Sequence, residues 1–119
     1  MTNAREYVKH GLDAICDNVK ACFPSGNILL PLITYAEVVN TQSSKWKDVI
    51  EYQVDVYAGH FEDVLDLTDK ACDAMSELGF TRTYVSPDTT CRVDTGLYHK
   101  VLSFQATINT NEMNIISNF

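Results

Sequence analysis

The chain opens with apolar residues spaced as they are on one side of a helix. They recur at intervals of four, three, four and three positions: Val8, Leu12, Ile15, Val19 and Cys22. Such spacing is typical of an amphipathic helix and predicts one over residues 3–21. The sequence FPSGN follows at positions 23–27, and its proline and glycine end the predicted helix.

Two strands are predicted next. Residues 29–41 are rich in Leu, Ile, Val and Tyr, with Pro31 near the start of the run, where a missing N–H is tolerated. A polar connection over residues 40–48 should lead to a second strand with clear alternation. One face of that strand carries Ile50, Tyr52, Val54, Val56 and Ala58, and the other carries Glu51, Gln53, Asp55 and Tyr57. The first face is predicted to join the core, and the second to meet solvent or a partner.

A second amphipathic helix is predicted between Phe61 and Gly79. Its apolar side carries Phe61, Val64, Thr68, Ala71, Cys72, Met75 and Leu78. Gly79 is a favoured residue just past the end of a helix. The opposite side carries Glu62, Asp63, Asp66, Asp69, Asp73 and Glu77. An acidic face of this kind is usually solvated, with a docking surface as the alternative.

The last two predicted strands are separated by turn signals. Residues 80–85 and 91–93 form the third predicted strand, interrupted by the turn cluster SPDTT around Pro87. Residues 97–109 form the fourth, with its apolar side chains largely on one face and Lys100 at the rim. Asp94, Thr95 and Gly96 are predicted to make the hairpin turn between them.

These elements predict an α+β fold in the order α-β-β-α-β-β. Two helices on one face of a four-stranded, mainly antiparallel sheet would bury both apolar stripes in one core. Residues 1–109 are predicted to form this single domain, and a composition of 45% hydrophobic and 21% charged residues argues against intrinsic disorder. Residues 110–119 form a tail, either an arm to an adjacent subunit or a disordered end.

Charge and hydropathy narrow the location and the partners. The formal net charge of −7 gives no attraction toward phosphate backbones and disfavours sequence-specific nucleic-acid binding. The uncharged run at residues 28–36 is far shorter than the ~20 residues that span a bilayer. The polar N-terminus lacks the apolar core of a signal peptide. We therefore expect residence in a cytosol or in an assembly built there.

No recognisable catalytic, cofactor or metal motif is present. The letters DTG at positions 94–96 open the active site of aspartic proteases, but those enzymes need a pair of such aspartates, and Leu97 follows here instead of a small residue. The histidines His10, His60 and His99 lie on different predicted elements without metal-ligand spacing. The sequence therefore predicts a protein that is not an enzyme and that needs no cofactor.

The cysteines are predicted to be buried thiols. Cys16, Cys22, Cys72 and Cys91 all fall within or beside apolar patterns, and none has CxxC spacing. A disulfide or a metal site stays open as an alternative.

Several surface features point to contacts with other proteins. Trp46, the only tryptophan, lies between Lys45 and Lys47 in a polar stretch, as an interface anchor would. The alternative is a loop tryptophan folded back over the sheet edge. Open sheet edges invite strand addition. In the C-terminal tail, Ile115, Ile116 and Phe119 are candidates for contact with a neighbouring subunit.

Residues 30–108 resemble the small tail completion, or tail terminator, proteins of long-tailed bacteriophages and prophages. The similar features are an early strand LPLITY, a strand YQVDVYA, an acidic helix ending LGF, a variable turn with proline, and a last strand opening LYHKVLSF. These are structural patterns rather than a catalytic signature.

The resemblance implies a homo-oligomeric ring, typically a hexamer, in the virion of a long-tailed phage. Such a ring caps the last ring of the tail tube, ends its polymerisation and docks the head connector, and it is assembled in the cytoplasm of the bacterial host. DNA passes through the lumen without specific binding, which suits an acidic chain. Glu51 and Asp55 are candidate lumen or interface residues, and the loop around Trp46 is the candidate tube contact.

Two rival interpretations stay open. A head-closure or connector protein of the neck shares the small size, the ring symmetry and the place in the virion. A soluble ligand-binding or enzymatic α+β domain, with a site built from residues distant in sequence, belongs to a different class of protein.

Overall fold

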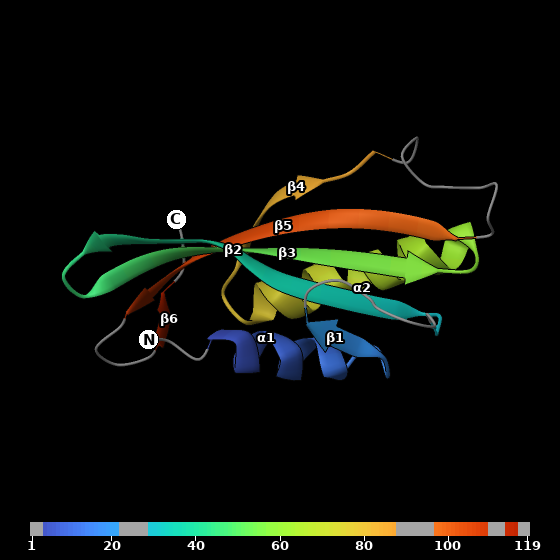
Figure 1. Ribbon diagram of the computed structural model, residues 1–119, viewed down its shortest axis with the longest axis horizontal. Helices are drawn as coiled ribbons and strands as arrows, with labels where there is room; N and C mark the ends of the chain where they lie inside the picture. The colour runs from blue at the N-terminus through green and yellow to red at the C-terminus, as the bar shows by residue number, and fades with distance from the viewer. Residues whose placement is uncertain (1–3, 22–28, 88–96, 110–113, 117–119) are drawn as a thin grey trace.

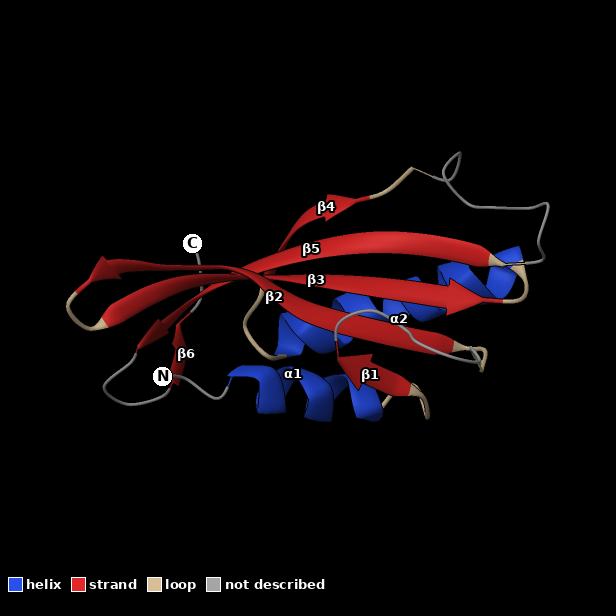
Figure 2. Ribbon diagram, viewed as in Figure 1, coloured by secondary structure: helices blue, strands red, loops and turns tan. Residues whose placement is uncertain are grey.

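The computed structural model describes residues 4–21, 29–87, 97–109 and 114–116. It has an α+β fold in which two helices cover one face of a long, twisted sheet (Figures 1 and 2). The elements are α1 (Ala4–Asp13), β1 (Val19–Ala21), β2 (Leu32–Ser44), β3 (Lys47–Ala58), α2 (Phe61–Glu77), β4 (Thr81–Val85), β5 (Tyr98–Asn109) and β6 (Asn114–Ile116).

The sheet has six strands in the order β1-β2-β3-β5-β4, and β6 pairs with β5. The β1–β2 pair is parallel, and the other pairs are antiparallel. The α+β class is therefore confirmed. The expected four strands in the order α-β-β-α-β-β were wrong in detail, because the described chain also forms the short strands β1 and β6, which extend the sheet at its margins.

The core lies between the helices and the facing side of the sheet. α1 contributes Val8 and Leu12, and α2 contributes Val64, Ala71 and Met75, all of them fully buried. They belong to one cluster with the inward residues of the central strands: Ile50, Tyr52, Val54, Val56, Leu102, Phe104, Ala106 and Ile108. The 4-3 stripes of the helices and the period-2 faces of the strands thus close one core.

The first helix is shorter than predicted. α1 ends at Asp13, and the backbone N–H groups of Ile15 and Cys16 both donate to the carbonyl oxygen of Leu12, each at 3.1 Å. Val19 then pairs in parallel with Ile33 of β2. The helical spacing of apolar residues continues past the end of α1 because Val19 is also buried, but in a strand of the sheet. Spacing alone does not distinguish a residue buried in a strand from one on the apolar face of a helix.

Asn18 stabilises the turn of the chain between α1 and β1. Its side-chain Nδ2 donates to the carbonyl oxygen of Leu29 at 2.6 Å, and its own carbonyl oxygen accepts from the Ile33 N–H at 3.0 Å. Asparagine competes for backbone hydrogen bonds and favours such turns over helix interiors.

The predicted polar connection at residues 40–48 is mostly strand. β2 continues to Ser44 and β3 starts at Lys47, so only Lys45 and Trp46 form the turn. Backbone hydrogen bonds between the two strands stabilise this part of the hairpin, and these bonds do not require apolar side chains. They are polar because this end projects beyond both helices, as Figure 1 shows at the left. We call residues 38–49 the arm.

α2 matches its prediction closely. Gly79 has a φ of 98°, the left-handed conformation that glycine adopts without strain. The Gly79 N–H donates to the carbonyl oxygen of Ser76 and the Phe80 N–H to that of Met75, each at 3.0 Å. This pair of bonds is the Schellman motif, which ends the helix and turns the chain into β4.

The remaining sequence predictions are met only in part. β4 and β5 lie within the predicted third and fourth strands, whereas residues 91–93 and the turn Asp94–Gly96 lie outside the described residues. Lys100, expected at the rim, is buried on the core side, where its Nζ donates to the carbonyl oxygen of Ser86 at 2.8 Å. In the tail, residues 114–116 form β6 against β5, and Phe119 lies outside the described part.

We predict that Met75→Ala lowers the free energy of unfolding by about 2–5 kcal/mol, because it leaves a cavity in the core. Urea denaturation followed by circular dichroism measures the change. Ser76→Ala, at the next and exposed position of α2, is the matched control and should stay within about 0.5 kcal/mol of the wild type. Equal losses in the two variants would contradict this placement of the core.

Candidate functional site

The arm presents an aromatic residue at its tip. Lys45 and Trp46 form the turn, with Ser44 paired to Lys47 behind them. The Trp46 side chain is 51% exposed, and the Lys45 Nζ lies 4.8 Å from the centre of its ring. Trp46 is thus displayed at the end of the hairpin, together with positive charge. Lys47 is also exposed.

Two irregularities in pairing shape the arm. The β2–β3 register shifts between Glu37 and Val39 and again between Gln42 and Ser44. Bulges of this kind increase the local twist of a hairpin and turn its side chains. Val38 and Val39, at the first shift, are 50% and 39% exposed, so the base of the arm carries apolar surface.

A polar cluster ties the base of the arm to the first helix. The Tyr52 hydroxyl donates to Oε1 of Glu37 at 3.2 Å, and Arg5 of α1 forms an ion pair with Oε2 of the same carboxylate at 3.6 Å. Tyr52 also packs edge-on against Phe80, with ring centres 5.8 Å apart. Burial raises the pKa of Tyr52, and the negative charge of Glu37 raises it further.

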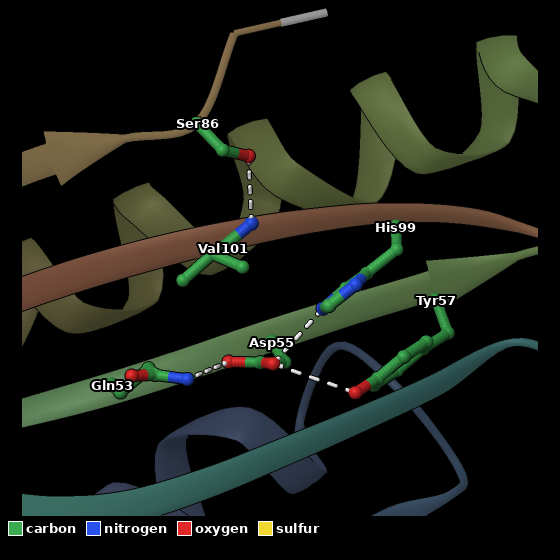
Figure 3. Close-up of polar contacts among 6 residues, drawn as sticks. All are labelled: Gln53, Asp55, Tyr57, Ser86, His99 and Val101. Carbon is green, nitrogen blue, oxygen red and sulfur yellow. Dashed lines mark hydrogen bonds and ion pairs between the residues drawn. The ribbon is translucent and has the colours of Figure 1, made fainter. Parts of the chain in front are cut away.

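A second polar cluster lies on the sheet face away from the helices. Figure 3 shows Gln53, Tyr57 and His99 directed toward the carboxylate of Asp55. Gln53 Nε2 lies 2.9 Å from Oδ1, and His99 Nε2 lies 2.9 Å from Oδ2. The Tyr57 hydroxyl donates to Oδ2 at 3.4 Å, and its ring stacks on that of His99 with centres 4.3 Å apart.

This second cluster joins neighbouring strands rather than lining an open site. Asp55 is 6% exposed and Tyr57 is 8% exposed. Burial, and after it the negative charge of Asp55, raise the pKa of Tyr57. In the same view, the Ser86 hydroxyl accepts from the Val101 N–H at 2.9 Å and holds the end of β4 against β5.

The predicted interface residues therefore differ in how far the structure exposes them. Asp55 is on the predicted face of its strand, expected to meet solvent or a partner, and within the single chain it is buried rather than open to solvent. Its role as a lumen or interface residue stays a prediction. Glu51, on the same face, is half-buried. Lys45, Trp46 and Lys47 are exposed together at the tip of the arm. Their interface roles, like that of Glu51, stay predictions.

The acidic side of α2 is exposed as expected. All six carboxylates lie on the surface: Glu62, Asp63, Asp66, Asp69, Asp73 and Glu77. Lys70 forms an i,i+4 ion pair with Asp66, with Nζ and Oδ2 3.2 Å apart. The helix therefore offers a predominantly negative surface.

The cysteines and histidines carry no assembled metal site in the described chain. Cys16 is a buried free thiol and Cys72 a half-buried one, whereas Cys22 and Cys91 lie outside the described residues. Among residues 4–21, 29–87, 97–109 and 114–116, no three His, Cys, Asp or Glu side chains come together as metal ligands would. None of the described helices has the length and apolar character needed to cross a membrane.

Comparison with known proteins gives the fold. No family model matches the chain, and no curated protein sequence matches it. Among solved structures, it is similar to a chain from the virion of a native gene transfer agent (GTA) particle, with a TM-score of 0.60 and 16% identity. The similarity covers 86% of this chain and 91% of that chain. At this identity, the likeness shows a shared fold.

We predict that Tyr52→Phe lowers the free energy of unfolding at pH 7 by about 0.5–1.5 kcal/mol, because the bond to Glu37 is lost. The difference from the wild type should shrink as the pH rises above about 10. Below about pH 10, Tyr52 is neutral in both the folded and the unfolded chain, so its contribution to stability is complete. At higher pH the unfolded chain loses the Tyr52 proton before the folded chain does, because the pKa is raised in the folded chain, and the contribution is progressively lost.

Urea denaturation at several pH values measures both effects. Tyr84→Phe removes a hydroxyl from a half-exposed tyrosine on β4 and should change stability at pH 7 by less than about 0.5 kcal/mol. A constant difference between Tyr52→Phe and the wild type up to pH 11 would contradict the placement of Tyr52.

We also predict that Asp55→Ala lowers the free energy of unfolding by about 1–3 kcal/mol, because it removes the buried carboxylate that Gln53, Tyr57 and His99 share. Its effect and that of His99→Ala should be less than additive in a double-mutant cycle. Asp69→Ala, on the exposed side of α2, is the control. Additive losses would show that the two side chains act independently.

Proposed function

We propose that this chain is a structural protein of a phage-like virion, a tail terminator that forms a ring on the end of the tail tube. Tube growth would stop there, and the ring would offer a docking surface to the head connector. The observation that carries the proposal is a fold shared, over 86% of the chain, with a component of a GTA virion. The sequence resemblance to tail completion proteins supports the narrower role.

The physical requirements of this role are modest. A ring requires one surface that binds a different surface of the next copy, with a rotation that closes. Capping requires one face that copies the tube's own contact and another that does not. The exposed arm and the acidic helix are two unlike surfaces that one copy could offer to others.

The charge of the chain suits a conduit for DNA. With a net charge of −7, each copy contributes to a negative potential around the ring. Such a potential disfavours adhesion of a phosphate backbone, so DNA could pass without binding.

We predict that particles assembled without this protein carry overlong tails that are not joined to heads. Nothing would then stop the addition of tube rings or provide the joint to the connector. Electron microscopy of particles from a strain lacking the gene measures tail length, and supplying the gene in trans should restore normal tails.

Two other outcomes would favour the rivals. Tails of normal length beside filled heads that leak DNA would indicate a head-closure protein. Particles with normal heads and tails would remove the chain from the virion and favour a soluble ligand-binding or enzymatic domain.

A further inference from the structure

Two complementary features lie at opposite ends of the molecule. The tip of the arm occupies one end of the longest dimension, which measures 48 Å. At the other end lie the start of β2, the end of β3 and the first turns of α2 (Figure 1). Residues at and near these segments line a pocket. A chain of this shape cannot bring its own tip to its own pocket.

The pocket combines an apolar lining with acidic residues. Its volume is about 440 Å³, ample for one large aromatic side chain. Ile15, Leu30 and Leu67 supply apolar surface, and Asp63 and Asp66 supply carboxylates. Leu30 is 41% exposed and so is open to a partner, whereas Leu67 lies buried at 8%. Lys70 also lines the pocket and is paired with Asp66.

The tip carries the matching chemistry. Trp46 is the largest apolar side chain that the arm exposes, and Lys45 places a cation over its ring. Interface energy tends to concentrate in such aromatic anchors when they enter a pocket, while charges at the rim select the partner and the orientation. An aromatic tip with positive charge therefore fits a pocket whose lining is partly apolar and partly acidic.

We infer that Trp46 of one copy enters this pocket in a second copy of the chain, with Lys45 facing the carboxylates of Asp63 and Asp66. The inference rests on the proposed function, because it supplies the contact between neighbours in the ring. The contact is heterologous: every copy uses its tip on one neighbour and its pocket on the other. It also reassigns the loop around Trp46 from the tail tube to the adjacent subunit.

The first experiment measures self-association of the full chain by sedimentation velocity over a range of concentrations. The wild type should form concentration-dependent oligomers, and Trp46→Ala should associate roughly 30-fold more weakly, the loss typical of an interface hot spot. A wild type that stays monomeric throughout, or a variant that associates like the wild type, would overturn the inference.

A mixing experiment tests whether the contact runs from tip to pocket. Gly59 lines the pocket, and among the described residues a Cβ there would meet only Leu30, at 3.8 Å, so Gly59→Leu should block the pocket without disturbing the fold. Trp46→Ala lacks the tip and Gly59→Leu lacks the pocket, so each alone should be monomeric at concentrations where the wild type just associates. Their mixture should form a 1:1 dimer and nothing larger, because one intact tip and one intact pocket remain.

A mixture that stays monomeric, while circular dichroism shows both variants folded, would overturn the inference. If Gly59→Leu fails to fold, Asp66→Lys replaces it as the pocket variant in the same mixture, and the same two results decide.

Charge reversal tests the electrostatic part. Lys45→Glu should weaken association at least about tenfold, and adding Asp66→Lys in the same chain should restore most of it, because the new charges again have opposite signs. Asp69→Lys is the matched control, since it makes the same charge change on α2 outside the pocket lining. Equal rescue by Asp69→Lys would show that net charge alone matters and would overturn the assigned contact.

Tail length separates this inference from the proposed function. If Trp46→Ala associates normally but particles carrying it have overlong tails, the tip meets the tube, so the inference fails and the proposed function stands. If Trp46→Ala abolishes association but deletion of the gene leaves tails normal, the contact stands and the terminator role fails.

Discussion

The structure depends on one long pairing, that of β2 with β3, which two register shifts interrupt. It runs from Leu32 opposite Tyr57 to Ser44 opposite Lys47. One half of this hairpin is covered by the helices and belongs to the core, and the other half projects as the arm. Because hydrogen bonds join the two strands along both halves, the core determines where the tip lies. A surface on such a scaffold needs little ordering when it binds, which lowers the entropic cost of association.

The junction between the two halves is held by Tyr52. Its ring packs in the core against Phe80, while its hydroxyl reaches Glu37, next to the first register shift of β2. Arg5 brings the start of α1 to the same carboxylate. The place where the sheet leaves its helical cover is therefore fixed by both apolar and polar contacts. These contacts set the direction of the arm relative to the core.

The sequence predicted those elements whose signals are local. α2 and its end at Gly79 follow from helical spacing and one glycine. The end of α1 could not be predicted, because Val19 continues the helical spacing although it is buried in a strand. Most of the arm, the predicted connection at residues 40–48, was missed as strand because its stabilising contacts are backbone bonds, which leave no apolar pattern. The bond from Asp55 to His99 depends on a strand register that joins positions 44 residues apart.

The same distinction applies to the candidate contact surfaces. Trp46 could be identified from sequence, because a lone tryptophan between two lysines is conspicuous wherever it lies. The pocket could not, because Ile15, Leu30 and Asp66 become neighbours only in the folded chain. Copies with a charge of −7 repel one another, so any contact between them needs local attraction strong enough to offset that repulsion. A basic tip opposite an acidic pocket supplies this local attraction. Because the arm holds the tip away from the body of the chain, the remaining negative surfaces of the two copies stay farther apart.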